Sequence, residues 1–309
     1  MHIIMEHDMR ATLKRGKGTM KVSGFTIARN VINYDYPIVE SIMSILPLCD
    51  EFVVAVGKSD DDTLRLMNMI SNEKFKIFET EWDDSLREGG RVLAIETDKA
   101  FAAVAPDSDW AFYLQADEVI HEKDHEKIHA AMLKYKDDPE VDGLLFNYLH
   151  FYGSFDYIGD ARQWYRKEIR VIKNNKIISS YRDAQGFRKN GQKLSVKEVD
   201  ATVYHYGWVK TPAAQQAKQR NFHKMWHDDE WMQKNVPEIQ EFDYSKIDSL
   251  QHYSGTHPGV MEGRIKATNW KFSFDPTKRK LPFKQKVLMF IEKKWGWKIG
   301  EYRNYKIIR

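Results

Sequence analysis

The stretch Tyr113-Leu-Gln-Ala-Asp-Glu-Val-Ile120 is the clearest indication of the fold in this chain. It follows the apolar residues 110–112, so a short apolar run leads directly into Gln115, Asp117 and Glu118. An apolar run bounded in this way is typical of a buried strand in an α/β sheet. Ligands of open α/β sheets bind at the carboxyl ends of such strands, where carboxylates suit Mg²⁺ or Mn²⁺. A polar turn followed by the acidic first turn of a helix would give the same pattern.

The residues on either side of this stretch alternate between strand-like and helix-like patterns. Strands are predicted at residues 22–27, 51–56, 75–78, 110–114, 141–150 and 168–173, and helices at residues 36–46, 63–71, 89–105 and 125–135. Strands that alternate with helices are joined by right-handed crossovers and pair in parallel. The sequence therefore predicts an α/β fold with a Rossmann-like, mostly parallel central sheet and flanking helices.

Composition divides the 309 residues into three parts. Residues 1–19 are polar and end before a second methionine, so we expect a disordered leader or a segment added for expression. Residues 20–208 carry the α/β pattern and are long enough for one large domain. Beyond Tyr206 the pattern changes, and residues 209–309 are predicted to form a basic, aromatic-rich helical extension with helices at 211–229 and 284–294.

Charge and cysteine content limit the class of protein. The formal net charge is +3, so no strong overall field favours nucleic acid as a partner. The single cysteine, Cys49, rules out an intrachain disulfide, and its apolar neighbours indicate a buried, inert thiol. Because we find no secretory signal and no apolar run of membrane-spanning length, the sequence predicts a cytoplasmic protein.

Four polar clusters follow predicted strands, at residues 26–30, 57–63, 82–90 and 115–118. Each one has a plain structural explanation: Asp60 to Asp62 could cap a helix, and Arg29-Asn30 could be a surface turn. The carboxyl ends of parallel strands meet at one edge of a sheet, however, so we expect the four clusters to lie together.

The order and spacing of three motifs resemble family-2 glycosyltransferases of the GT-A fold. The motifs are Phe25-Thr-Ile-Ala-Arg-Asn30, the segment 53–63 and Gln115-Ala-Asp117, and the resemblance covers about residues 21–206. It is best with small bacterial members that make lipopolysaccharide or capsule sugars. The resemblance implies metal-dependent, inverting transfer of a sugar from a nucleotide-sugar donor to a glycan or lipid-linked acceptor.

The resemblance also implies roles for individual residues. Asp117 would coordinate the Mn²⁺ or Mg²⁺ ion, which offsets charge on a diphosphate leaving group. The residues that would lie near the nucleoside, the diphosphate or the donor sugar are Thr26, Ala28, Arg29, Asp60, Gly89, Gly90, Lys99 and Gln115.

Two residues depart from the family pattern. Gln115 stands at the first position of the metal motif, where the family usually has an aspartate, and an amide brings no charge. Gly57 ends the second strand, where the family often has another aspartate. These departures favour an alternative, a catalytically degenerate relative that binds nucleotide or glycan without transfer.

The second half of the sequence adds a candidate base and a candidate metal ligand. By the same resemblance, Asp183 matches the position of an acidic residue and would remove a proton from the acceptor hydroxyl. Glu118 and Asp160 are rivals for that role, and Asp183 in a solvated loop is the plain alternative. His205, between two tyrosines, resembles a late histidine that reaches the metal or diphosphate, although a packed core or surface histidine is also compatible.

The end of the chain is strongly basic. Residues 275–309 contain eleven Lys or Arg against three Asp or Glu, interleaved with aromatic residues. This composition suits peripheral contact with the inner face of a membrane or with a lipid-linked acceptor. It also suits nucleic acid, although the rest of the chain has no motif for it. The plain alternative is a helix that packs on the domain through its 287–291 face, with its lysines in water.

Overall fold

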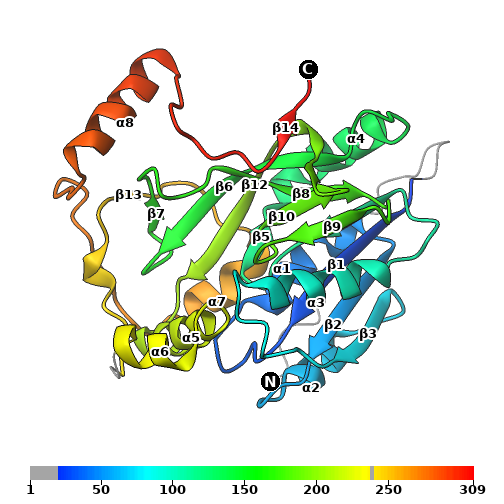
Figure 1. Cartoon of the computed structure of the whole chain (residues 1–309), viewed down its shortest axis with the longest axis horizontal. Helices are drawn as coiled ribbons and strands as arrows, with labels where there is room; N and C mark the ends of the chain where they lie inside the picture. Colours follow the sequence, from blue (N-terminus) through cyan, green and yellow to red (C-terminus); the bar gives the residue numbers. More distant parts are fainter. Residues whose placement is uncertain (1–19, 237–239) are drawn as a thin grey trace.

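The computed structural model describes residues 20–236 and 240–309 (Figure 1). The prediction of a disordered leader at residues 1–19 lies outside the described residues. The strands are β1 (Val22–Ala28), β2 (Glu51–Gly57), β3 (Phe75–Thr80), β4 (Trp110–Tyr113), β5 (Glu118–Ile120), β6 (Gly143–Tyr152), β7 (Tyr157–Gly159), β8 (Lys167–Lys173), β9 (Ile178–Tyr181), β10 (Gly186–Lys189), β11 (Gln192–Lys193), β12 (Ser195–Trp208), β13 (Leu250–His252) and β14 (Lys306–Ile307). The α-helices are α1 (Ile38–Ile45), α2 (Thr63–Ile70), α3 (Arg91–Ala102), α4 (His125–Tyr135), α5 (Pro212–Lys224), α6 (Asp229–Asn235), α7 (Glu262–Lys266) and α8 (Phe283–Trp295).

The N-terminal half of the main sheet is parallel. Strands β3, β2, β1 and β4 lie in that order and pair in parallel, and helices α1, α2 and α3 connect them. Successive residues of β2 point to opposite faces: Phe52 and Val54 pack with α1 and α4, whereas Val53 packs with α3. Helices therefore cover both faces, which confirms the α/β prediction for this half.

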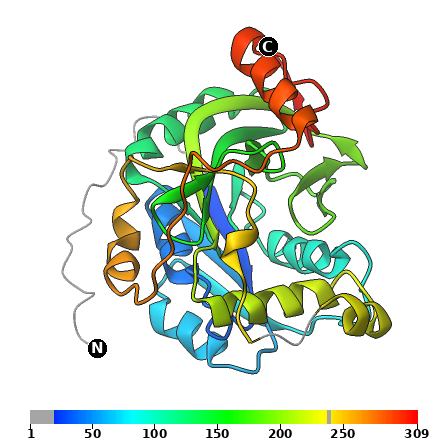
Figure 2. The same ribbon diagram turned by 90° about the vertical axis from the view of Figure 1, so that its left-hand side faces the viewer.

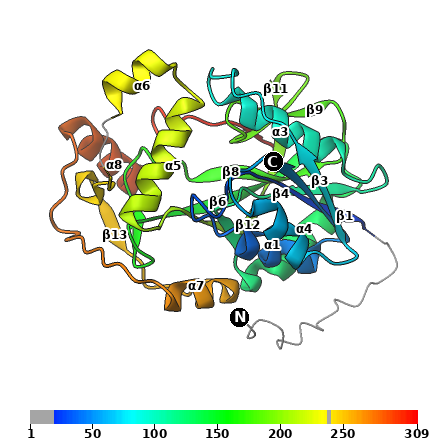
Figure 3. The same cartoon turned by 90° about the horizontal axis from the view of Figure 1, so that it is seen from below.

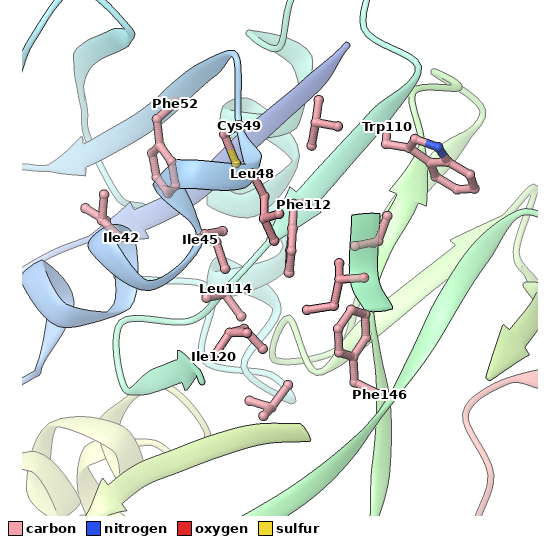
Figure 4. Close-up of a cluster of buried hydrophobic side chains, with 14 of the residues drawn as sticks. Ile42, Ile45, Leu48, Cys49, Phe52, Trp110, Phe112, Leu114, Ile120 and Phe146 are labelled. Atoms are coloured by element: carbon pink, nitrogen blue, oxygen red, sulfur yellow. The ribbon is translucent and has the colours of Figure 1, made fainter. Parts of the chain in front are cut away.

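The first core cluster joins strands and helices that are far apart in the sequence. Figure 4 shows Ile42 and Ile45 of α1 in one cluster with Phe112 of β4, Leu114 just after β4, and Phe146 of β6. Cys49 lies in this cluster, and burial raises the pKa of its thiol well above the ordinary value. The prediction of a buried thiol is therefore confirmed, and the raised pKa keeps the thiol protonated, in agreement with the expected low reactivity.

The other half of the sheet mixes parallel and antiparallel pairs. Strand β8 lies antiparallel between β4 and β6, and the long strand β12 runs parallel to β6. Strand β12 also pairs with β5, so the chain after Asp117 is tied to residues 203–205. This register places the carboxyl end of β12 beside the end of β4.

The C-terminal segment is not only helical, which corrects the prediction for residues 209–309. Strand β14 pairs in parallel with β12, and β13 pairs antiparallel with β7, so two short strands of this segment join the main sheet. Figure 3 shows α7 and α8 at the periphery of the molecule. Within the described part of the chain, none of the helices combines the length and apolar character needed to cross a membrane.

Candidate active site

A cavity of about 400 Å³ lies at the carboxyl ends of β1, β4 and β12. Helix α5 contributes one of its walls, and the turn after β9 contributes another. The polar lining residues are Arg29, Gln115, Asp117, Asp183, His205, Lys218, Gln219, Asn221 and His223, and the aromatic ones are Tyr34, Tyr36, Trp82, Tyr113, Tyr165, Trp208 and Phe222. Three of the four predicted polar clusters reach this cavity, and the cluster at 57–63 does not line it.

Asp117, His205 and Lys218 meet in the cavity wall. The Lys218 Nζ donates a hydrogen bond of 2.9 Å to Asp117 Oδ2 and another of 2.8 Å to the Gly207 carbonyl. The His205 Nε2 lies 3.7 Å from the same Asp117 oxygen. Burial opposes a charge on Asp117, but Lys218 and the neighbouring cations outweigh burial and hold the pKa of Asp117 well below its usual range. Asp117 is therefore a carboxylate at neutral pH.

A second histidine determines which nitrogen of His205 carries the proton. The His150 Nε2 lies 2.7 Å from the Tyr165 carbonyl, which can only accept, so this nitrogen carries hydrogen. Burial lowers the pKa of His150 to about 3 and that of His205 to about 4, so both rings are neutral at pH 7. The two Nδ1 atoms lie 3.1 Å apart, and His150 Nδ1 must accept from His205 Nδ1. The His205 Nε2 is left with a free lone pair on the side of Asp117.

Asp117 and His205 are the two predicted metal ligands, and their surroundings determine how well a metal ion fits. Among the described residues, no group of three or more His, Cys, Asp or Glu side chains could hold a metal ion. The Asp117 carboxylate and the His205 Nε2 lone pair do converge, and Gly207 keeps their surroundings open, because a Cβ there would lie 2.6 Å from both. Mg²⁺ in nucleotide sites takes few protein ligands and completes its shell with substrate phosphates and water. The pair thus fits an ion that arrives with a diphosphate, and Lys218 brings a further positive charge to the same oxygen.

Asp183 lines the same cavity and sits in an unusual turn. Its neighbours Arg182 and Ala184 have φ values of 57° and 59°, in the left-handed region that non-glycine residues rarely adopt. The Cβ of Asp183 packs on Gly90, where an added Cβ would come within 2.7 Å. Burial raises the pKa of Asp183, although the Arg182 charge and backbone amides favour its charged form. The carboxylate is therefore poorly solvated, which suits proton transfer.

The two rival bases lie elsewhere. Both Glu118 oxygens accept 2.6 Å hydrogen bonds from Arg170, and the ion pair is fully buried. The Asp160 carboxylate forms an ion pair with Arg279 at a distance of 2.9 Å, and it does not line the cavity. The structure therefore offers Asp183, and neither rival, to a ligand in this cavity.

The residues predicted around the donor are only partly brought together. Arg29 and Gln115 line the cavity. Six others do not line it: Thr26, Ala28, Asp60, Gly89, Gly90 and Lys99. Of these six, Gly90 packs against Asp183, which does line the cavity. Thr26 is buried, and its hydroxyl donates a hydrogen bond of 2.6 Å to the Leu114 carbonyl. Lys99 forms an ion pair of 2.6 Å with Glu96.

Trp82 explains the glycine at position 57. A Cβ on Gly57 would lie 2.3 Å from the Trp82 Nε1, so the indole fills the space that a side chain at 57 would need. Arg29 lies over the same indole at 5.2 Å and makes a bidentate ion pair with Asp84. At Gly57, where the family often has an aspartate, the Trp82 indole therefore takes the place of a side chain and forms an aromatic wall of the cavity.

Several residues of the site had no signal in the sequence. Lys218, Phe222 and His223 lie within the predicted helix at 211–229, whose role was not assigned. His150 lies inside a predicted strand, 55 positions before its partner His205. Lys218 and Phe222 are four residues apart, about one helical turn, so both lie on one face of α5. Only the packing of that helix shows which face meets the cavity.

No protein-family model matches this chain, and no curated protein does. Among solved structures, S. aureus TarS 1-349 is similar at 12% identity with a TM-score of 0.38, over 66% of this chain and 64% of that one. The same protein in complex with UDP gives 16% identity and a TM-score of 0.38, with the same coverage. The 4-diphosphocytidyl-2C-methyl-D-erythritolsynthase from Anaerococcus prevotii DSM 20548 gives 11% identity and a TM-score of 0.38, over 65% of this chain and 96% of that one. This chain thus spans less than two thirds of the length of TarS 1-349.

Proposed function

We propose that this protein is a GT-A-type glycosyltransferase that moves a sugar from a nucleoside-diphosphate sugar to a glycan or lipid-linked acceptor. The observation that carries the proposal is the meeting of Asp117, His205, Lys218 and Asp183 around one aromatic-lined cavity. The first three suit a diphosphate, and the fourth suits proton removal. Aromatic walls of this kind suit the planar base and the apolar face of a sugar ring.

The charged groups support a diphosphate leaving group. Lys218 is anchored by Asp117 and by the Gly207 carbonyl, so its ammonium is held in place before any ligand binds. Charges fixed in advance stabilise a developing phosphate charge without reorganisation. Asp117 and His205 would hold a Mn²⁺ or Mg²⁺ ion that enters with the donor, and such an ion would neutralise charge on the diphosphate.

The transfer step follows from the position of Asp183. Its carboxylate would take the proton of an acceptor hydroxyl as that oxygen attacks the anomeric carbon. The bond from the anomeric carbon to the diphosphate oxygen breaks, and the nucleoside diphosphate leaves with the electron pair. A single displacement of this kind inverts the configuration at the anomeric carbon.

A degenerate relative that binds without transfer is the second candidate, and Gln115 favours it. The Gln115 amide donates a hydrogen bond of 3.3 Å to the Ala184 carbonyl, next to Asp183. This side chain therefore supports the turn that holds Asp183, and it brings no charge to the cavity. A screen of nucleotide sugars with Mn²⁺, Mg²⁺ or chelator separates the two candidates. Released nucleoside diphosphate together with glycosylated acceptor supports the transferase. Nucleotide binding without release supports the degenerate relative, and neither binding nor release contradicts both.

Asp117→Asn should reduce sugar transfer by about 10²–10³-fold, because it removes the charge that anchors Lys218 and any metal at the diphosphate. The measurement is kcat/KM for the donor found in the screen. Asp62→Asn makes the same change at an exposed residue that starts α2, and it should leave kcat/KM almost unchanged. Equal activity in the two variants would contradict the role of Asp117.

His150→Phe should weaken metal-dependent nucleotide binding by about 10–100-fold, the usual effect of losing the partner of a metal-binding histidine. The phenyl ring cannot accept from His205 Nδ1, so the neutral His205 ring is no longer held with its Nε2 lone pair toward Asp117. Calorimetric titration of Mn²⁺ in the presence of a nucleoside diphosphate measures the effect. His129→Phe on α4 is the matched control. An unchanged affinity in His150→Phe would show that the histidine pair has no part in the site.

A further inference from the structure

Helix α8 presents an apolar face to the surroundings. None of its residues is buried, and Phe283, Val287 and Phe290 are 82%, 40% and 59% exposed. Their spacing of four and three places them on one side of the helix. Trp295, the last residue of α8, is 50% exposed, and Trp297, just beyond the helix, is 64% exposed. Exposed large apolar side chains that lie this close together indicate a contact surface rather than an ordinary solvent-exposed surface.

The opposite side of α8 is fastened to the domain by its only acidic residue. Glu292 pairs with Arg162 at 2.9 Å and with Arg166, and the Glu292 side chain is only 13% exposed. The Arg162 guanidinium also donates a hydrogen bond of 2.6 Å to the Ile299 carbonyl. Figures 1 and 2 both show α8 at the edge of the molecule, beyond the layers that flank the sheet. The helix is thus anchored on one side and open on the other.

The exposed charged residues of α8 are all positive. The exposed lysines of α8 are Lys284, Lys286, Lys293 and Lys294. A cleft of about 380 Å³ beside Phe290 adds Arg166 and Arg279, although Glu292 also lines it. Residues 275–309 carry eleven basic and three acidic residues, a net charge of +8. Since the whole chain carries +3, the remaining residues sum to −5, and the positive charge is concentrated here.

We propose that α8 and the following turn, which we call the α8 surface (residues 283–297), dock on an anionic lipid bilayer. Its exposed phenylalanines and tryptophans suit the boundary between head groups and acyl chains, and its lysines suit anionic phosphates. The charge complementarity selects the lipid surface over a second copy of this chain, because two α8 surfaces would bring eight lysines together. Docking of the α8 surface on a bilayer is independent of the proposed enzymatic activity.

Sedimentation of the purified full chain with lipid vesicles tests the proposal. The chain should bind vesicles of phosphatidylcholine with phosphatidylglycerol, should bind pure phosphatidylcholine much more weakly, and should be released by salt. Lys286→Ser/Lys293→Ser should lower the affinity by about tenfold or more. The control Lys134→Ser/Lys234→Ser removes the same charge from α4 and α6 and should bind like the unchanged chain. Equal losses in both double variants, or equal binding to both kinds of vesicle, overturn the proposal.

The apolar residues are tested by Phe283→Ser/Phe290→Ser, against a control at exposed apolar residues of other helices, Met69→Ser/Leu133→Ser. Because all four side chains are exposed, each variant should keep the circular dichroism spectrum of the unchanged chain. Vesicle binding should fall at least about tenfold in the first variant only. Size exclusion would show whether the chain dimerises through Phe283 and Phe290. Dimerisation that depends on these residues, together with vesicle binding that is unaffected by their loss, would mean that a second copy covers this face. That result would overturn the proposal.

Discussion

Asp183→Asn should lower the rate of sugar transfer by about 10²–10⁴-fold while nucleotide binding stays nearly unchanged, because a general base acts on the acceptor and not on the donor. The asparagine keeps the shape of the side chain against Gly90 and cannot take a proton. The experiment is a transfer assay at saturating donor and acceptor, beside a calorimetric titration of the nucleoside diphosphate.

The matched control is Asp160→Asn, at the rival base that pairs with Arg279 outside the cavity. Its transfer rate should stay near that of the unchanged enzyme. Transfer by Asp183→Asn within about tenfold of the unchanged rate would exclude Asp183 as the base. A loss of nucleotide binding equal to the loss of rate would assign Asp183 to the donor site instead.

The pH dependence of transfer provides an independent check on Asp183. A base works only when deprotonated, so the rate should fall as the pH falls through its pKa. Because burial raises the pKa of Asp183, the acid limb of kcat/KM should lie above the ordinary range of aspartate. Arg182→Gln removes a charge that favours the carboxylate, and this variant should move the limb to higher pH.

Arg170→Met should destabilise the fold by about 3–5 kcal/mol, because it leaves the Glu118 carboxylate buried without its partner. Both side chains are fully buried, and two hydrogen bonds of 2.6 Å join them. Arg170 also donates to the Ile169 and Gln185 carbonyls at 2.8 and 2.9 Å, which lose their donors in the variant. Urea unfolding followed by circular dichroism measures the change.

The double variant Arg170→Met/Glu118→Leu distinguishes the unpaired charge from lost packing. Removing both charges should restore a large part of the stability, since buried ion pairs often contribute little beyond apolar groups of similar volume. Arg87→Met, in the exposed ion pair with Asp229, should leave the urea midpoint almost unchanged. A double variant as unstable as Arg170→Met would mean that packing and the carbonyl contacts, not the Glu118 charge, dominate.

Local sequence patterns predicted the individual elements well. The helix expected at residues 125–135 is α4 with the same bounds, and the strands expected at 22–27 and 51–56 differ from β1 and β2 by one residue at their ends. Apolar periodicity reports which residues face a core, and in these segments the buried residues lie close in the chain. The long strand β12 was missed over most of its length, because Lys197, Glu198 and Asp200 interrupt its apolar pattern.

The sequence predicted part of the candidate site, through the residues that follow strands and, for Asp183 and His205, through the family resemblance. Arg29, Gln115 and Asp117 come directly after β1 and β4, so the rule that ligands bind at strand ends finds them. Lys99 and Asp60 were assigned by resemblance alone, and their side chains are engaged elsewhere: Lys99 pairs with Glu96, and Asp60 contacts Asn30. Lys218 contributes a charge to the site from a helix about a hundred residues later in the chain.

The sequence by itself determined the alternation of strands and helices from β1 to β4, the buried thiol and the strand end at Gln115 to Asp117, because each depends on neighbours within about one turn or strand. Only the tertiary structure decided that Lys218 meets Asp117, that His150 orients His205, and that the α8 lysines face outward. Those relations depend on the register of β12 against β5 and β6 and on the packing of α5 and α8. Such long-range contacts depend on the free energy of the whole fold, which no short window of sequence contains.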